Sequence, residues 1–140
     1  MTAFYTVLTD VDHVKDPIAE SARAILDGHI VLSRDLAEKG LYPAIDIESS
    51  ISRLMTKIAA PEQAKLANAF KKYYSLYEEN RDLFSIGAYQ AGNNAELDLA
   101  VSLYPKFEKF LGQFIHEPVD IFTARTQLEE VFAPQQQPDS

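Results

Sequence analysis

The sequence predicts an α/β segment followed by an all-α segment, and three observations lead to this fold class. Up to residue 55, short runs of β-branched and aromatic residues alternate with short helical patterns. After Pro61, apolar residues recur at the three- and four-residue steps of amphipathic helices. The 140 residues, of which 46% are hydrophobic, suffice for about one domain with its own core.

Charge and composition exclude several classes of function. The net charge of −8 argues against a broad nucleic-acid-binding surface. The chain has no cysteine, which excludes disulfides, thiolate metal sites and cysteine catalysis. No apolar run reaches the roughly 18 residues that a membrane span needs, and no basic stretch followed by an apolar one indicates a signal peptide. We therefore expect no nucleic-acid partner and at most peripheral association with a membrane.

The N-terminal part of the chain predicts a strand and then a helix. "TAFYTVLT", residues 2–9, is nearly continuously apolar, as in a strand buried on both faces of a parallel sheet. Such a strand needs neighbours on both sides, so this α/β segment reads as an unfinished core. A polar loop follows, and Pro17 then suits a first helical turn capped by Asp16. Gly28 suits the C-terminal cap of this helix.

The next residues predict a second strand, a short helix and an extended stretch. "HIVLS", residues 29–33, is a short β-like run, and "RDLAEKG" reads as a short helix closed by Gly40. "YPAIDI", residues 42–47, is expected to be extended, because the residue before a proline is displaced from the helical region.

The remainder of the chain predicts helices and a polar tail. Residues 61–84 indicate a helix of about six turns, and a loop with two glycines follows at 85–94. Residues 95–113 indicate one or two helices, divided near Pro105. A last helix is expected to start at Asp120 or Thr123. The tail "PQQQPDS" has the composition of a disordered segment.

The motifs of several kinds of catalytic site are missing. No stretch fits the phosphate-binding GxxxxGK[ST] pattern or the zinc-binding HExxH pattern, and the three histidines lie far apart. The serines at 49, 50 and 52 lack a GxSxG context, which argues against a serine hydrolase. Asp46 and Glu48 lie two residues apart in an extended segment. They could hold a metal, serve acid–base chemistry, line a solvated edge or anchor a neighbouring arginine.

Two tyrosines differ from the other aromatic residues, most of which follow helical spacing. Tyr42 lies beside Pro43, and Tyr89 lies near Gly87, both in loop-like contexts. A loop aromatic can form the wall of a pocket for a planar ligand such as a nucleobase. Ordinary packing is the alternative for each.

Three stretches together resemble one known family. "TAFYTVL", "DPIAESARAILDGHIVLSRDLAEKGLYPAIDIESSISRLM" and "NRDLFSIGAYQAG" resemble the C-terminal part of the flagellar type III export ATPases. That family is similar to the injectisome ATPases and to the catalytic subunits of rotary ATP synthases, and the resemblance runs from about Thr2 to Phe132. It implies that residues 1–58 form the incomplete C-terminal end of a RecA-like nucleotide-binding core. It further implies a helical C-terminal domain at 59–133, followed by a disordered tail at 134–140.

The resemblance also implies three site residues. Arg53, in "SISR", matches an arginine finger that reaches the nucleotide site of the neighbouring subunit, where it stabilises charge on the transferred phosphoryl group. The alternative is an ion pair with Asp46 or Glu48 in the same subunit. Tyr42 matches the aromatic that packs on the adenine of ATP, and Tyr89 falls where a second aromatic closes that pocket.

The function implied is that of a homohexameric ATPase that energises type III export of flagellar proteins. ATP with Mg²⁺ is the implied cofactor, and the phosphate-binding loop, the catalytic glutamate and the Mg²⁺-side aspartate belong to upstream parts of the family. This chain by itself is therefore expected to be inactive. Implied partners are export chaperone–cargo complexes, the export gate and the central stalk protein, in the cytoplasm at the inner membrane. The alternatives are a non-catalytic interaction module and an injectisome ATPase.

Overall fold

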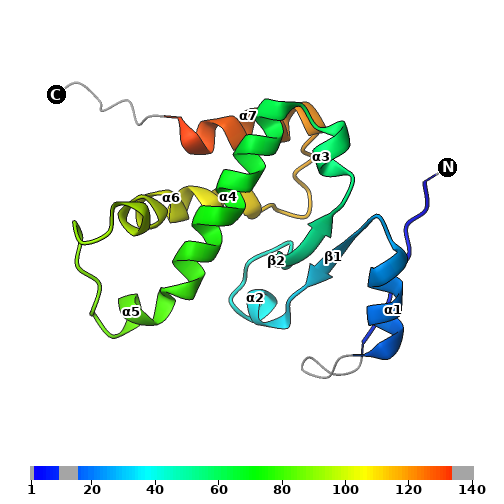
Figure 1. Ribbon diagram of the computed structural model, residues 1–140, viewed down its shortest axis with the longest axis horizontal. Coiled ribbons are helices and arrows are strands. Elements are labelled where there is room, and N and C mark those ends of the chain that lie inside the picture. The colour runs from blue at the N-terminus through cyan, green and yellow to red at the C-terminus, as the bar shows by residue number, and fades with distance from the viewer. Residues whose placement is uncertain (1, 10–15, 134–140) are drawn as a thin grey trace.

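The computed structural model describes residues 2–9 and 16–133, with a small hairpin that lies between the first helix and a helical bundle (Figure 1). We call residues 16–58 the α/β segment and residues 59–133 the helical segment. The α/β segment contains α1 (Pro17–Ile25), β1 (Gly28–Leu32), α2 (Arg34–Glu38), β2 (Ile45–Ser52) and α3 (Met55–Ile58). The helical segment contains α4 (Pro61–Glu79), α5 (Arg81–Ser85), α6 (Ala95–Leu111) and α7 (Ile121–Phe132). The predicted order, α/β followed by all-α, is confirmed.

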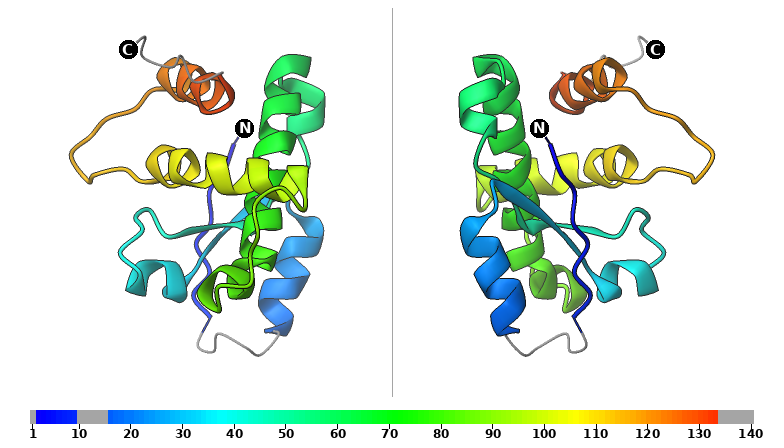
Figure 2. Two further views of the ribbon diagram at one scale, coloured as in Figure 1. Left: turned by 90° about the vertical axis from the view of Figure 1, so that its left-hand side faces the viewer. Right: turned by 90° about the vertical axis from the view of Figure 1, so that its right-hand side faces the viewer.

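The strand expected at residues 2–9 is not formed. This stretch runs as an extended trace without regular secondary structure (Figure 2), and Phe4 and Leu8 are 94% and 89% exposed. A strand requires a hydrogen-bonded neighbour, and the sheet that the structure describes contains only β1 and β2, which pair with each other. The strand prediction for this apolar stretch is therefore wrong. The polar loop expected next and the tail at 134–140 lie outside the described residues.

The sheet is an antiparallel pair, and β2 bulges between its two paired stretches. Gly28 pairs with Ser52 and His29 with Ile51, and the next pair is Val31 with Asp46. Between these pairs, β1 contributes one residue and β2 contributes residues 47–50. The extra residues of β2 therefore leave the ladder and are free to make other contacts.

Gly28 has a different role from the predicted helix cap. Helix α1 ends at Ile25 with Leu26 as its C-cap, and Gly28 opens β1. A Cβ atom at this position would lie 2.7 Å from the carbonyl oxygen of Ile51. Glycine is needed here because the two strands approach closely, not because a helix ends.

The signals for the start of α1 and the end of α2 are confirmed, whereas the stretch predicted as extended at 42–47 is a strand only from Ile45. The Asp16 carboxylate accepts a hydrogen bond from the backbone N–H of Ile18 (2.8 Å), with Pro17 in the first turn of α1. Ser33 caps α2, and Gly40 follows that helix with a φ of 78°, a conformation that favours glycine.

The core of the described residues lies in the helical segment. Apolar side chains of α4, α6 and α7 meet in one cluster, which comprises Phe70, Tyr74, Leu103, Phe107, Leu128 and Val131. Phe107 is completely buried and lies 4.4 Å from Phe70, centroid to centroid. Ile47, from the bulge of β2, packs against this cluster. The hairpin is thus attached to a bundle that has its own core.

One detail of the helical segment corrects the sequence prediction, and two decide between alternatives that the sequence left open. Helix α6 continues through Pro105. Although proline lacks an N–H and removes one helical hydrogen bond, Leu103 and Phe107 on either side of it are buried in the same cluster, which holds the helix together. The long helix expected at 61–84 is two helices, α4 and α5, which meet at Asn80. Asp120, rather than Thr123, caps α7.

Candidate functional site

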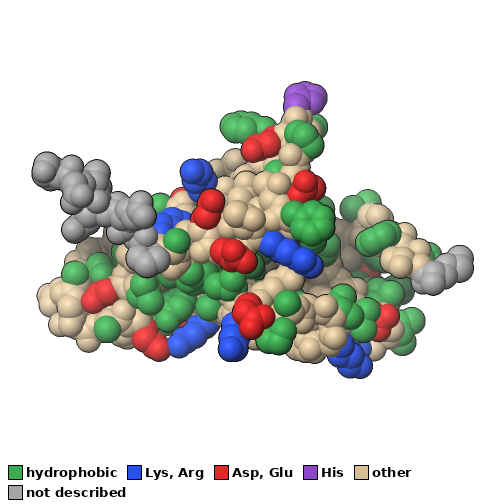
Figure 3. All heavy atoms as spheres, turned by 90° about the horizontal axis from the view of Figure 1, so that it is seen from above, with side chains coloured by type: hydrophobic (Ala, Val, Ile, Leu, Met, Phe, Trp, Pro, Cys, Tyr) green, Lys and Arg blue, Asp and Glu red, His purple; other side chains and the backbone are tan. Residues whose placement is uncertain are grey.

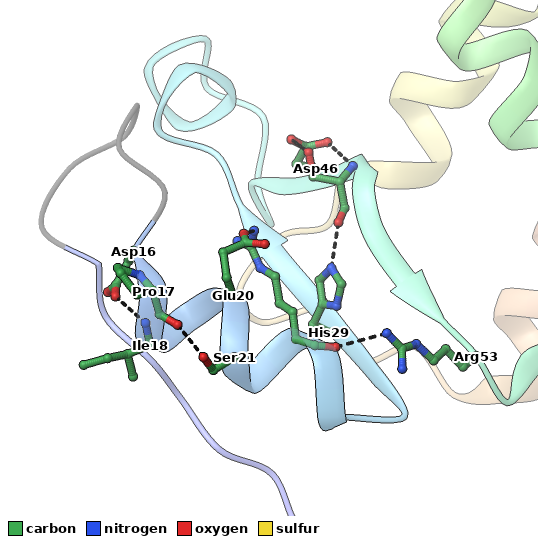
Figure 4. Close-up of polar contacts among 10 residues, drawn as sticks. Asp16, Pro17, Ile18, Glu20, Ser21, His29, Asp46 and Arg53 are labelled. Carbon is green, nitrogen blue, oxygen red and sulfur yellow. Dashed lines mark hydrogen bonds and ion pairs between the residues drawn. The ribbon is translucent and has the colours of Figure 1, made fainter.

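Arg53 lies immediately after β2 and caps the C-terminal end of α1 (Figure 4). Its backbone N–H donates to the carbonyl of Asp27 (2.8 Å). Its guanidinium donates from Nη1 to the carbonyl of Ala24 (3.1 Å) and from Nη2 to that of Arg23 (3.2 Å). The last carbonyls of a helix lack helical partners and carry partial negative charge, so a cation is favourable there. Arg53 is thus fixed by carbonyl oxygens and remains exposed to solvent.

Asp46 organises the bulge of β2 and does not pair with Arg53. One carboxylate oxygen accepts hydrogen bonds from the backbone N–H groups of Glu48 (3.0 Å) and Ser49 (2.9 Å), and the other accepts from the Ser49 hydroxyl (2.7 Å). Within residues 2–9 and 16–133, no ion pair joins Arg53 to Asp46 or Glu48. Asp46 is thus a local anchor of the backbone, a role that was not among the four predicted for the acidic pair.

Three successive carbonyls of the bulge accept hydrogen bonds from side chains. Lys71, on α4, donates to the carbonyls of Glu48 (3.0 Å) and Ser50 (3.4 Å). His29 Nε2 lies 3.0 Å from the carbonyl oxygen of Ser49. Lys71 is not among the residues predicted from the sequence. In the sequence, Lys71 is marked only by its position beside Phe70, on a helix that packs on the core. The carbonyl groups that it contacts lie more than 20 residues earlier in the chain, so no local pattern indicates them.

Tyr42 presents an exposed ring on a loop that is tied to the helical segment. The loop joins α2 to β2, the Tyr42–Pro43 peptide bond is cis, and the tyrosine is 58% exposed. The carbonyl of Tyr42 accepts a hydrogen bond from the backbone N–H of Gln113 (2.8 Å), just after α6. The backbone of the loop is therefore held, while the ring remains available for stacking.

Tyr89 lies on the loop between α5 and α6 and is more constrained. Its hydroxyl donates to one carboxylate oxygen of Asp98 (2.6 Å), and the other oxygen accepts from the backbone N–H of Gly92 (2.8 Å). This hydrogen bond raises the pKa of Tyr89 above its usual value. The ring meets Phe84 edge-on, at 5.1 Å between centroids and 70° between planes. The described contacts do not bring Tyr42 and Tyr89 together in one pocket.

A shallow cavity lies where the end of α2 faces the bundle. Its volume is about 230 Å³, and it is lined by Leu36, Lys39, Gly40, Leu41, Glu78, Arg81, Tyr104 and Glu108. The Tyr104 hydroxyl donates to the Glu78 carboxylate (2.8 Å), and its ring stacks on Tyr77. Burial, together with Glu78, raises the pKa of Tyr104 far above its usual value. Neither Tyr42 nor Tyr89 lines this cavity.

The described residues fit only part of a nucleotide. An exposed aromatic ring can stack on a base, and an exposed guanidinium can reach a phosphate. In the stretches that the structure covers, no three His, Cys, Asp or Glu side chains gather as a metal site requires. The sequence also lacks a glycine-rich phosphate loop of the GxxxxGK[ST] type. The described residues therefore do not gather ligands for Mg²⁺, and the sequence has no loop of this type for a complete triphosphate.

The surface is of mixed character. On the face drawn in Figure 3, positive and negative side chains are interspersed, with apolar side chains between them. Among the described helices, none has both the length and the apolar character that crossing a bilayer requires.

Comparison with known families divides the chain in two. Residues 59–130 match the family described as T3SS EscN ATPase C-terminal domain. Residues 1–52 match the nucleotide-binding domain of the ATP synthase alpha/beta family.

Individual relatives agree with these families. A "Flagellum-specific ATP synthase" of Salmonella typhimurium is 53% identical over 132 residues, which are 94% of this chain and 29% of that protein. The protein of the same name from Pseudomonas aeruginosa is 49% identical over 133 residues, which are 95% of this chain and 30% of the relative. The chain therefore spans less than a third of the length of these relatives.

Solved structures of type III secretion ATPases also resemble this chain. The assembled ATPase EscN of the enteropathogenic E. coli type III secretion system superposes with a TM-score of 0.87 at 38% identity, over 92% of this chain and 31% of EscN. EscN in complex with its central stalk EscO gives a TM-score of 0.78 at 36% identity, over 84% of this chain and 29% of that one. The resemblance inferred from the sequence is confirmed: the chain belongs to the type III secretion ATPases, corresponds to their C-terminal part, and is related to the alpha/beta family of ATP synthases.

Proposed function

We propose that this chain is the C-terminal part of an ATP hydrolase that energises type III export of flagellar proteins. The observation that carries the proposal is the 53% identity to a flagellum-specific ATP synthase over nearly the whole chain. The lower identity to EscN, 38%, favours the flagellar branch over the injectisome branch. In this proposal, residues 1–58 end a RecA-like core and residues 59–133 form the helical C-terminal domain.

Arg53 is proposed to act as an arginine finger on ATP bound by the neighbouring subunit of a homohexamer. The geometry supports this role in two ways. The guanidinium is exposed at the end of an ordered strand, and its known partners are neutral carbonyls, so its positive charge is not neutralised by an ion pair within the described part of the chain. An uncompensated guanidinium can fork onto phosphoryl oxygens and stabilise the charge that develops during transfer.

Tyr42 and Tyr89 are proposed to contact the adenine ring. The 58% exposure of Tyr42 leaves its ring free to stack, and the Asp98 bond fixes the orientation of Tyr89. Bound ATP with Mg²⁺ supplies the phosphoryl group that is transferred to water. Because this chain has no phosphate loop and no cluster of metal ligands among its described residues, those contacts belong to the rest of the protein. The chain alone is expected to hydrolyse no ATP.

The helical segment is proposed to receive partners of the export machinery. Its own buried core lets it present a stable surface, which also supports the second candidate function, a non-catalytic interaction module. The assembled EscN and its complex with the central stalk EscO support a homohexamer and a stalk contact. Export chaperone–cargo complexes and the export gate are the further partners proposed, at the cytoplasmic face of the inner membrane.

The trans role of Arg53 can be tested by complementation between two inactive variants of the longer ATPase that carries this chain. One variant has Arg53→Ala, and the other lacks the lysine of its phosphate loop. Each alone is expected to lose about 10³-fold or more in ATP turnover. In mixed hexamers, an intact phosphate loop meets an intact Arg53 across some interfaces, so turnover is expected to return.

Two results would overturn this role. Wild-type turnover by the pure Arg53→Ala variant would exclude a catalytic arginine. The absence of recovery in hexamers that contain both variants would exclude action across the interface. Arg34→Ala is the matched control, because Arg34 is an exposed arginine whose described partner is Glu38 on the same helix, and its turnover is expected to stay at the wild-type level.

A further inference from the structure

The bulge of β2 is the part of the hairpin that the helical segment holds. Residues 47–50 have no partners in the pairing register, which passes from His29–Ile51 directly to Val31–Asp46. The bulge is ordered by its own side chains: Ser50 accepts a hydrogen bond from the backbone N–H of Val31 (3.0 Å) and donates to the carbonyl of Asp46. The position of the bulge is therefore defined relative to β1.

A short, paired stretch connects the bulge to Arg53. Ile51 pairs with His29, Ser52 pairs with Gly28, and the N–H of Arg53 donates to the carbonyl of Asp27. Every residue between the bulge and the guanidinium is thus held against the opposite strand. A displacement of the bulge would be carried along this stretch to the base of the Arg53 side chain.

Lys71 is the polar link between this bulge and the helical segment. Its ammonium donates to two carbonyls of the bulge, those of Glu48 and Ser50. Lys71 follows Phe70, which is buried in the core of the bundle, so the backbone from which the lysine extends is firmly placed. Ile47 adds an apolar contact from the bulge to the same core.

The next residue along the helix provides a contrast. Lys72 forms an ion pair with Glu96 on α6 (2.7 Å) and lies over the ring of Tyr73. Both of its partners belong to the helical segment. Two neighbouring lysines on α4 therefore serve different purposes: Lys72 joins two helices, whereas Lys71 joins the helical segment to the strand that ends at Arg53.

We infer that Lys71 is a positioning residue for Arg53, which it serves by fixing the β2 bulge to α4. This inference rests on the proposed role of Arg53 and adds to it a residue of the helical segment that contacts neither nucleotide nor reacting atoms. Because small misplacements of a catalytic group have large effects on rate, loss of the two carbonyl contacts is expected to lower kcat. The KM for ATP is expected to stay unchanged, since Lys71 does not touch the adenine-side residues.

The complementation assay tests this inference with an internal control. Lys71→Met keeps the aliphatic stem and removes the donors. On the subunit that supplies Arg53, it is expected to lower the recovered turnover about tenfold. The same substitution can be placed on the other subunit, which supplies the phosphate loop and already carries Arg53→Ala. There, Lys71→Met is expected to change the recovered turnover less than about twofold. A residue that acts only through Arg53 has no effect on a subunit that lacks Arg53.

Two further variants separate positioning from general stability. Lys72→Met removes the neighbouring ammonium and is expected to leave the recovered turnover within about twofold on either subunit. Lys71→Arg keeps donors that can reach carbonyls and is expected to restore at least about half of the turnover. Thermal melting and hexamer assembly of all variants, measured in parallel, show whether a loss of rate follows from unfolding.

The outcomes distinguish this inference from the proposed function. Equal effects of Lys71→Met on both subunits, or effects no larger than those of Lys72→Met, would overturn the positioning role while recovery of turnover still supports the trans finger. If mixed hexamers with Lys71 intact show no recovery of ATP turnover, both the trans role of Arg53 and the positioning role of Lys71 are overturned.

Discussion

The two segments of this chain are stabilised in different ways. All eight buried residues among those described lie between Phe70 and Val131, in the helical segment, and residues 2–9 and 16–58 contain none. The α/β segment is held instead by the β1–β2 ladder and by side chains that bond to backbone carbonyls. The proposed finger and adenine contact, Arg53 and Tyr42, lie in the segment without a core. The bundle thus provides the scaffold, and the hairpin takes its position from it.

The largest expected effect tests the core of the helical segment. Phe107→Ala removes a completely buried ring and is expected to lower the free energy of unfolding by about 3–5 kcal/mol. Leu32→Ala is the matched control in the hairpin, because Leu32 is 71% exposed, and its effect is expected to stay within about 0.5 kcal/mol. Chemical denaturation measures both. Similar effects of the two substitutions would refute the contrast between the segments.

The next effect tests whether close strand approach maintains the hairpin. Gly28→Ala would place a Cβ atom 2.7 Å from the Ile51 carbonyl and force the strands apart, at a cost of about 1–3 kcal/mol. Gly112→Ala is a milder comparison, since its Cβ would lie 3.1 Å from the carbonyl oxygen of Glu108. Denaturation and the backbone chemical shifts of residues 28–52 measure the change. Unaltered shifts in Gly28→Ala would show that the approach is not needed.

A smaller effect is expected in the cavity between the segments. Tyr104→Phe removes the hydroxyl that donates to Glu78 and is expected to lower the free energy of unfolding by about 1.5 kcal/mol, the lower end of the range for a hydrogen bond to a charged group. Tyr73→Phe, on a half-buried tyrosine of α4, is the control. An ultraviolet titration should find that Tyr104 ionises well above the usual tyrosine range, because burial and Glu78 raise its pKa. Ionisation near the ordinary value would contradict the described geometry.

The smallest effect concerns the cap of α7. The Asp120 carboxylate accepts a hydrogen bond from the backbone N–H of Thr123 (2.7 Å), which lowers the pKa of Asp120 below its ordinary value of 3.8. Because the native pKa is lowered, the cap stabilises the folded state fully at pH values above 3.8. This stabilisation is lost as the pH falls through the native pKa. Asp120→Ala should therefore melt earlier than wild type near neutral pH, and the difference should vanish in strong acid.

Asp120→Asn separates the cap from the charge. Asparagine also caps helices well, so this variant should retain most of the stability at neutral pH. It should also lose the pH dependence that wild type gains from the carboxylate. A difference between wild type and Asp120→Ala that stays constant into strong acid would contradict the assignment.

Features specified by neighbouring residues could be predicted from the sequence. Asp16 with Pro17, Gly40 and Asp120 act within one helical turn, and each occupies a helix end as expected. The helical segment was predictable because its core follows helical spacing. The placement of Tyr42 and Tyr89 in loops was also predictable, since proline and glycine act locally.

Features that depend on distant residues could not be predicted in this way. Residues 2–9 have strand composition, but a strand also requires a partner, which composition does not specify. Gly28 is explained by the Ile51 carbonyl, 23 residues later, rather than by the helix before it. Lys71 is an exposed lysine whose carbonyl partners lie on β2, more than 20 residues earlier in the chain. Pro105 failed to end α6 because the core on both sides of it outweighs one lost hydrogen bond.

The hydrogen bond from Gln113 to the carbonyl of Tyr42 gives the molecule a built-in reporter. It is a backbone bond that joins the end of α6 to a loop of the α/β segment, so it exists only while the two segments are docked. Its amide proton can exchange with solvent deuterium only while the segments are undocked, whereas amides within α6 remain protected by their own helix. The exchange rate of this single proton therefore reports the fraction of molecules in which the hairpin is separated from its scaffold, without any label or substitution.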